Sequence, residues 1–227
     1  MPIILNIETS TTNCSVSLSD DNETICLIEE NFEQFSHSKS LHVFIDQILK
    51  RSKIVPKDLS AISISEGPGS YTGLRIGVSA AKGLCFGLGI PLISIDTLFT
   101  LSRKIECSEG YIISALDARR NEIYYSILKT NKCKLPKKIT GPDSLELSKD
   151  SFEKYLNKDV VNFVGNSNEK IKSLINHKNA KFTKFMLPSA NEMGIIAYSK
   201  FKKKHFVDIS SFQPKYLKEF GGKKINI

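Results

Sequence analysis

The pattern of apolar and polar positions in the first half of the chain predicts strands and helices in a regular order. Residues 3–7 are apolar except for Asn6, as expected of a buried strand, and residues 14–19 alternate as a half-buried strand does. Residues 38–53 place apolar side chains three and four positions apart, which is the spacing of an amphipathic helix. In chain order, we predict strands over 3–7, 14–19 and 24–30, a helix over 38–53, a strand over 61–65, a helix over about 73–88, a strand over 91–95 and a helix running towards Ser102.

The second half of the chain carries weaker signals. Two strands over 111–117 and 122–129 are joined by a short charged connection, and a third strand is predicted over 160–164. The predicted helices are a short one through Leu156, one over 167–175 and one after the Ser189–Glu192 capping box. We place the domain boundary near residues 103–110, which divides the chain into residues 1–105 and 106–227.

The order of three strands, helix, strand and helix indicates the fold class. It is the order of a ribonuclease-H-like half domain, and two such halves make the α/β architecture of actin-like ATPases. A flavodoxin-like domain is the alternative, but its strands and helices would alternate from the start.

Two turns could bind phosphate. The segment from Ser65 to Gly77 joins a strand to a helix, and it offers backbone N–H groups at the helix start through Gly67, Gly69, Ser70 and Thr72. Its glycine spacing matches neither a Walker A loop nor a dinucleotide fingerprint. The turn at Glu8, Thr9 and Ser10 could hold phosphate, and its carboxylate could orient hydrated magnesium. A structural role for both turns stays open.

The helix over 73–88 contains an unusual number of small residues. Gly73, Gly77 and Ala81 lie four apart, with Ala80, Gly83 and Gly87 near the same side. Glycine inside a helix costs about 1 kcal/mol relative to alanine, so this spacing needs a reason. Small residues let a second backbone approach closely. The approaching element could be the chain's own sheet, a partner helix, or both on different faces.

The net charge of +8 is unevenly distributed. Residues 1–128 hold 11 basic and 15 acidic side chains, whereas residues 129–227 hold 21 basic, all lysine, and 9 acidic. A lysine-rich half could attract RNA, but arginine forks are the better phosphate ligands and that half has none. We therefore favour a solvated surface for these lysines.

Other chemistry is weakly represented. The five cysteines have no CxxC spacing, which fits a reducing compartment rather than a disulfide or zinc framework. His37 and His42 are five apart and would diverge on a helix, so no metal site is predicted. The N-terminal run resembles a strand rather than a signal peptide. The longest uncharged run, 83–95, is too short to cross a membrane.

Several motifs together resemble the TsaB (YeaZ) family. Gly-Pro-Gly-Ser-Tyr-Thr-Gly-Leu-Arg-Ile-Gly at 67–77 is the most specific of them. The supporting pieces are Ile-Glu-Thr-Ser-Thr at 7–11, Cys-Ser-Val-Ser-Leu at 14–18, His-Ser at 37–38, Ala-Lys-Gly-Leu at 81–84, Asp-Ala-Arg at 117–119 and Pro-Lys-Tyr-Leu at 214–217. The family commonly has Asp where this chain has Glu8, which weakens a magnesium or ATP role for the first turn.

The resemblance implies an actin-like fold with a reduced second lobe and a non-catalytic, cytoplasmic scaffold. Such a subunit pairs with TsaD, works with the ATPase TsaE, self-associates as a homodimer and meets tRNA only through the complex. The complex transfers threonylcarbamoyl to N6 of the adenosine beside the anticodon. The subunit itself requires no cofactor, because its partners handle ATP and Mg²⁺. The implied partner interface comprises Leu41, Ile45, Ile48, Gly73, Gly77, Ala80, Ala81 and Leu84.

Two alternatives remain for the function. A stand-alone actin-like ATPase or phosphotransferase would use the two turns, and Glu8→Gln would abolish its activity. A metallopeptidase would need a clustered ligand set, which the sequence does not suggest. For the scaffold, we expect Gly77→Leu to destroy pairing without unfolding the lobe.

Overall fold

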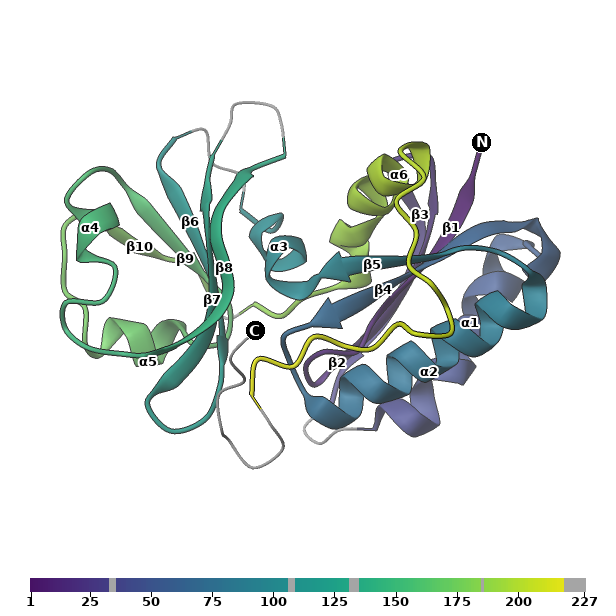
Figure 1. The fold of residues 1–227 in the computed structure, drawn as a ribbon, viewed down its shortest axis with the longest axis horizontal. Helices are drawn as coiled ribbons and strands as arrows, with labels where there is room; N and C mark the ends of the chain where they lie inside the picture. Colours follow the sequence, from purple (N-terminus) through teal and green to yellow (C-terminus); the bar gives the residue numbers. More distant parts are fainter. Residues whose placement is uncertain (33–35, 106–108, 131–134, 185, 219–227) are drawn as a thin grey trace. The chain divides into compact units, whose positions relative to one another are not determined.

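The computed structural model describes residues 1–32, 36–105, 109–130, 135–184 and 186–218 (Figure 1). The chain forms two compact units. The first comprises Met1–Thr97 and Pro188–Tyr216, and the second comprises Leu98–Leu187 and Leu217–Ile227.

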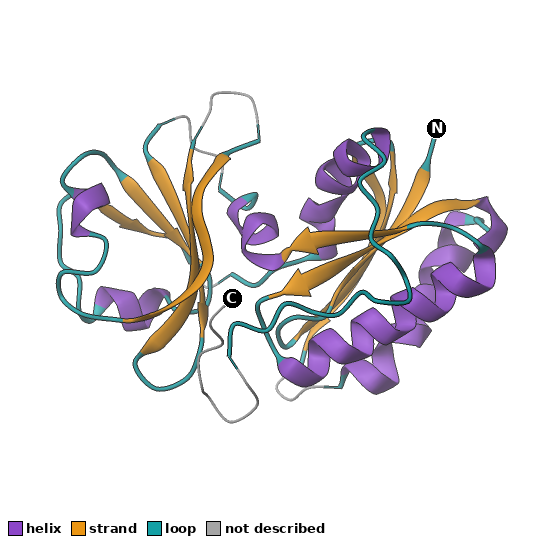
Figure 2. Cartoon of the chain, in the orientation of Figure 1, coloured by secondary structure: helices purple, strands orange, loops and turns teal. Residues whose placement is uncertain are grey.

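The first unit is a five-stranded sheet covered on both faces (Figure 2). Its strands lie in the order β3-β2-β1-β4-β5, in which β2 is antiparallel to both neighbours and β1, β4 and β5 are parallel. They are β1 (Ile3–Glu8), β2 (Asn13–Asp20), β3 (Glu23–Asn31), β4 (Leu59–Gly67) and β5 (Leu92–Asp96). The other elements are α1 (His37–Ser52), α2 (Tyr71–Leu88), α6 (Gly194–Lys202) and the 3-10 turns Pro56–Asp58 and Ala190–Met193. Helices α1 and α2 cover one face of the sheet and α6 covers the other (Figure 1).

Alternation along β1 places apolar and polar side chains on opposite faces. Leu5 and Ile7 join the core beneath α1 and α2. Between them, the fully buried Asn6 bonds Ser17 and Ser63 through side-chain contacts of 3.0 and 2.7 Å. At this point of β1 the α6 face is therefore held by a satisfied polar group, and the α1–α2 face is held by apolar packing.

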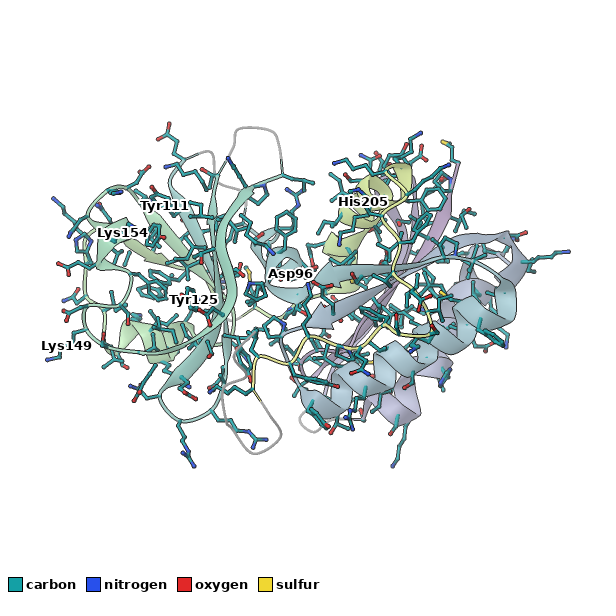
Figure 3. All side chains as sticks on the ribbon, viewed as in Figure 1. Asp96, Tyr111, Tyr125, Lys149, Lys154 and His205 are labelled. Atoms are coloured by element: carbon teal, nitrogen blue, oxygen red, sulfur yellow. The ribbon has the colours of Figure 1, made fainter. Side chains whose placement is uncertain are left out.

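The second unit repeats the sheet order of the first. Its strands lie in the order β8-β7-β6-β9-β10, with antiparallel β6–β7–β8 and parallel β6–β9–β10. They are β6 (Tyr111–Asp117), β7 (Glu122–Lys129), β8 (Lys137–Glu146), β9 (Val161–Val164) and β10 (Ala180–Phe182), with helices α3 (Thr97–Ser102), α4 (Glu153–Leu156) and α5 (Asn168–Lys172). Tyr111 and Tyr125 lie on the side of the sheet that carries α4 and α5 (Figure 3), where Tyr125 meets Phe152 with ring centroids 5.5 Å apart.

This architecture confirms the predicted α/β, actin-like fold. All the predicted strands are present, and β8 and β10 are additional. Strand β8 lacks an apolar alternation because its residues are exposed or half-buried, and β10 has only three residues. The second sheet keeps all five strands, so the reduction of this unit lies in its helices. Helices α4 and α5 have 4 and 5 residues, against 16 and 18 in α1 and α2.

The boundary between the two units differs from the predicted one between residues 105 and 106. The predicted boundary falls at the start of residues 106–108, which lie outside the described residues. The first break lies at Thr97, and residues 188–216 return to the first unit. Long-range polar contacts explain the return: Asn13 donates to the Pro188 carbonyl at 3.0 Å, and the Ala190 N–H donates to Ser15 Oγ at 2.9 Å.

Candidate functional site

The first predicted turn and the glycine-rich loop pack directly against each other. The hairpin between β1 and β2, residues 8–13, is called the first hairpin below. The Ser70 N–H donates to the Ser10 carbonyl at 2.6 Å, and Thr9 Oγ1 donates to the Gly73 carbonyl at 2.9 Å. Glu8, Thr9 and Ser10 are each at most 1% exposed. The structure therefore brings the two predicted turns together, but through bonds to each other.

Three glycines make this close packing possible. A Cβ added to Gly69 would lie 2.4 Å from the Ser10 carbonyl oxygen, and one added to Gly73 would lie 2.2 Å from that of Thr9. At Gly77 it would lie 2.2 Å from Thr9 Oγ1. Real Cβ atoms do not approach this closely, so these positions exclude any side chain. Contrary to the sequence-based expectation, Gly77→Leu should therefore unfold the lobe.

Glu8 lies fully buried inside the first hairpin. Its Oε1 accepts the Ser10 N–H at 2.6 Å and the Ser65 hydroxyl at 3.1 Å. Burial raises the pKa of Glu8 above its usual 4.5, although these hydrogen bonds act in the opposite direction. This carboxyl is therefore enclosed, and the chain's own Ser10 and Ser65 already engage its Oε1.

A C-terminal segment covers the loop that follows β4. We call residues 207–216 the strap. The Lys215 N–H donates to the Glu66 carbonyl at 2.7 Å, and Lys215 Nζ pairs with Glu66 Oε1 at 2.6 Å. A Cβ on Gly67 would lie 2.7 Å from the Lys215 carbonyl oxygen. Further along α2, Lys82 Nζ donates to the carbonyls of Ser210 and Phe212, both at 3.1 Å. The loop is therefore held by the strap as well as by the first hairpin.

The end of the strap contributes to an exposed cluster at the start of α2. The Arg75 guanidinium lies 4.0 Å from the Tyr71 ring centroid and donates to Tyr216 Oη at 3.2 Å. The Tyr71 and Tyr216 rings are 4.8 Å apart. Ser70 caps the helix by accepting the Gly73 N–H at 3.2 Å, and the next predicted residue, Thr72, is exposed. Sequence reasoning did not foresee the pairing of Lys215 with Glu66, although the Pro214–Leu217 motif pointed to this segment.

Most of the predicted interface residues lie inside the first unit. Leu41, Ile45, Ile48, Gly73, Gly77, Ala80 and Ala81 are buried, and Leu84 is half-buried. The glycines at 73 and 77 therefore admit the chain's own first hairpin, and Ala81 lies in the apolar core. A second stripe on α2 faces outwards and comprises Ser79, Gly83, Phe86 and Gly87, called the outer stripe below. Phe86 is 84% exposed, and a Cβ on Gly83 or Gly87 would meet nothing within 4 Å.

The candidate metal and thiol groups are structural within the described residues. His37 is buried and donates from Nε2 to the Thr11 carbonyl at 2.6 Å, and burial lowers its pKa. Burial also raises the pKa of Cys14 and Cys85 to about 12. Cys26 is half-buried and free, while Cys107 and Cys133 lie outside the described residues.

The described residues contain neither a helix that could span a membrane nor a cluster of metal-ligating side chains. No described helix is both long and apolar enough to cross a bilayer. Likewise, no group of three or more His, Cys, Asp and Glu side chains that could hold a metal ion was found among the described residues.

Two α/β units with the same sheet order, and a first hairpin packed against its own helix, define a protein of the actin-like class. A family model described as "TsaD: tRNA N6-adenosine threonylcarbamoyltransferase" matches residues 33–224. The chain belongs to the TsaB (YeaZ) family, as its motifs predicted.

Relatives and solved structures agree with this assignment. The chain is similar to the tRNA threonylcarbamoyladenosine biosynthesis protein TsaB of Bacillus subtilis, with 29% identity over 95% of this chain and 93% of that protein. TsaB of Haemophilus influenzae is 36% identical over 54% of this chain, and the match spans only 52% of that protein. The fold matches YeaZ from Pseudomonas aeruginosa with a TM-score of 0.84 and 22% identity, covering 96% of this chain and all of that one.

Proposed function

We propose that this chain is the non-catalytic TsaB subunit of a cytoplasmic complex that makes threonylcarbamoyladenosine in tRNA. In this role it pairs with TsaD, acts with TsaE and can self-associate. The observation that carries the proposal is the closed first hairpin, where the chain's own groups occupy the positions that a phosphate would need. The names of the relatives support the pathway.

The geometry favours a scaffold over a stand-alone ATPase. A phosphate held at the start of α2 needs free N–H groups, yet the Ser70 N–H already serves the Ser10 carbonyl. Glycine at 69 and 73 leaves room only for the backbone of the first hairpin. Glu8 is fully buried, and its Oε1 already accepts hydrogen bonds from the Ser10 N–H and the Ser65 hydroxyl. The residues present therefore do not fit Mg²⁺ and ATP, and we assign nucleotide handling to the partner subunits.

The outer stripe offers the pairing surface. Gly83 and Gly87 lie four apart with Phe86 between them, so all three project from one side of α2. Absent side chains at the two glycines let a partner helix approach, and the exposed Phe86 ring supplies apolar area to bury. Helix α1 lies beside α2 on the same face of the sheet and exposes Val43, which is 49% accessible.

Pairing can be tested by mixing the full chain with TsaD from the same organism and measuring the mass by light scattering on a sizing column. The parent chain should form a heterodimer. Gly83→Leu should abolish it while the chain stays folded, because the added side chain points into open space in the monomer. Circular dichroism of the variant alone checks its folding.

Lys203→Leu is the matched control. It adds the same side chain at an exposed position at the end of α6, on the opposite face of the sheet. It should leave pairing intact. If parent and TsaD do not associate at all, the scaffold proposal fails. If Gly83→Leu pairs as well as the parent does, the outer stripe is not the interface.

A further inference from the structure

The connection between β6 and β7 has an unusual backbone. In this second hairpin, residues 117–122, Arg119 and Arg120 both have positive φ, at 70° and 48°. Consecutive residues in this region are normally glycine, asparagine or aspartate, because a Cβ is strained there. Both arginines are exposed. Both arginines bear this backbone strain although their exposed side chains gain no packing. This combination indicates a functional role for their guanidinium groups.

The base of the second hairpin is held by hydrogen bonds, and its carboxylates are already paired. Asp117 Oδ1 accepts the Arg119 N–H at 2.6 Å and Lys170 Nζ at 2.9 Å. Glu122 pairs with Lys218. Lysines thus bind the flanking carboxylates, and no ion pair to either arginine is present among the residues described in the structure. The two exposed guanidinium groups therefore belong to a hairpin whose base is held in place by these bonds.

The surroundings favour an extended polyanion over a small ligand. By the structural division, the second unit holds 20 basic and 11 acidic residues, a net charge of +9, whereas the first unit is close to neutral. The two arginines therefore belong to the lysine-rich unit. A hairpin tip is convex, whereas small-molecule sites are concave. Arginine binds phosphate oxygens bidentately, which lysine cannot do.

We propose that Arg119 and Arg120 form a docking site for the phosphodiester backbone of RNA. The identity of the RNA as tRNA rests on the proposed function, whereas the polyanion chemistry rests on the hairpin itself. The contact is independent of sequence and positions the RNA, because it reaches phosphates and not base edges.

A double variant separates the strain from the binding. Arg119→Gly with Arg120→Asn supplies residues suited to positive φ, so its melting temperature should equal or exceed that of the parent. Its affinity for a tRNA transcript, alone and together with TsaD, should fall at least about tenfold at low salt. The slope of log affinity against log salt should shrink by about 2. The double variant should also keep its stability and its pairing with TsaD. A loss of RNA affinity under those conditions supports the site, whatever the outcome of the Gly83→Leu pairing experiment.

Two controls isolate the guanidinium forks. Lys137→Gln with Lys181→Gln removes the same charge at exposed positions near the opposite end of the same sheet. That variant should bind RNA close to the parent level. Arg119→Lys with Arg120→Lys keeps the charge but loses the forks, so its affinity should fall between the two.

Five outcomes would overturn the proposal. Four are parental RNA affinity in the Gly/Asn variant, an equal loss in the Gln control, no RNA binding by the parent with or without TsaD, and competition by polyglutamate as strong as that by RNA. Displacement of RNA by equimolar inorganic phosphate would also contradict it, because it would indicate an enclosed small-anion site.

Discussion

The two hairpins occupy equivalent places in the two units and do opposite things. Each joins the first two strands of a sheet with the same order and lies beside the loop after the fourth strand. In the first unit that loop is tied to the hairpin by the Ser70–Ser10 bond, and in the second the Asn166 side chain accepts the Asp117 N–H at 2.8 Å. The first hairpin is buried, whereas the second exposes two arginines.

The difference follows from the helix after the fourth strand of each unit, which is α2 after β4 and α5 after β9. After β4, α2 begins with glycines that allow it to close on the first hairpin, and the strap adds cover. After β9, α5 has only five residues and reaches the second hairpin through the Lys170 side chain, which binds Asp117 and the Glu122 carbonyl without covering the tip. A hairpin in this fold can therefore become a structural joint or a binding tip, depending on the length and small residues of the following helix.

The largest effect is expected from adding one methyl group to a glycine of α2, because the change in stability should differ between its inner and outer sides. Gly73→Ala places a Cβ 2.2 Å from the Thr9 carbonyl oxygen, so the free energy of unfolding should fall by about 3 kcal/mol or more, or folding should fail. Gly83→Ala on the outer side of the same helix should instead gain up to about 1 kcal/mol. Urea denaturation of both variants measures this contrast, and similar stabilities would refute the packing of α2 on the first hairpin.

Removing the strap's charge should cost less. In Lys215→Met, the Glu66 carboxylate, whose side chain is only 8% exposed, loses its ion-pair partner. Because Lys215 itself is half exposed, we expect a loss of about 1–2 kcal/mol in unfolding free energy. Thermal denaturation checks this value, and a change below the measurement error would mean that the strap does not hold the loop.

Neutralising Glu8 should stabilise the protein in a pH-dependent way. Because the folded pKa of Glu8 is raised, its carboxyl contributes stability below pH 4.5 that is lost as pH rises through the folded pKa. Glu8→Gln avoids that loss, so its melting temperature should exceed the parent's by an amount that grows from acid to neutral pH. A variant less stable than the parent at pH 8 would contradict the assigned burial.

The smallest effect is expected at the base of the second hairpin. Lys170 and Asp117 are 21% and 43% exposed, so Lys170→Met should change the unfolding free energy by less than about 1 kcal/mol. Comparing this variant with Lys215→Met in the same melting experiment tests whether the strap's ion pair with Glu66 contributes more stability than the ion pair at the base of the second hairpin. Equal losses would remove that distinction.

The sequence predicted the fold well because strong local periodicity marks its elements. Residues 3–7 and 38–53 carry apolar patterns that have one structural solution each. Strand β8 escaped prediction because its half-exposed residues show no alternation. The return of residues 188–216 to the first unit depends on contacts such as Asn13 with Pro188, which no local pattern encodes.

The candidate site was predictable in its residues but not in its orientation. Stripes at 73, 77 and 81 and at 79, 83 and 87 both have a spacing of four, and spacing alone does not tell which one faces the core. The close approach of Thr9 decides the matter. The arginine pair at 119 and 120 was visible in the sequence, but its positive φ angles were not.

We propose that the first hairpin is a structural joint and not a nucleotide site. The sharpest test is calorimetric titration of the full chain with ATP and Mg²⁺, run in parallel on Glu8→Gln. No magnesium-dependent binding is expected in either protein. Saturable, magnesium-dependent binding of ATP by the parent that Glu8→Gln removes would contradict it.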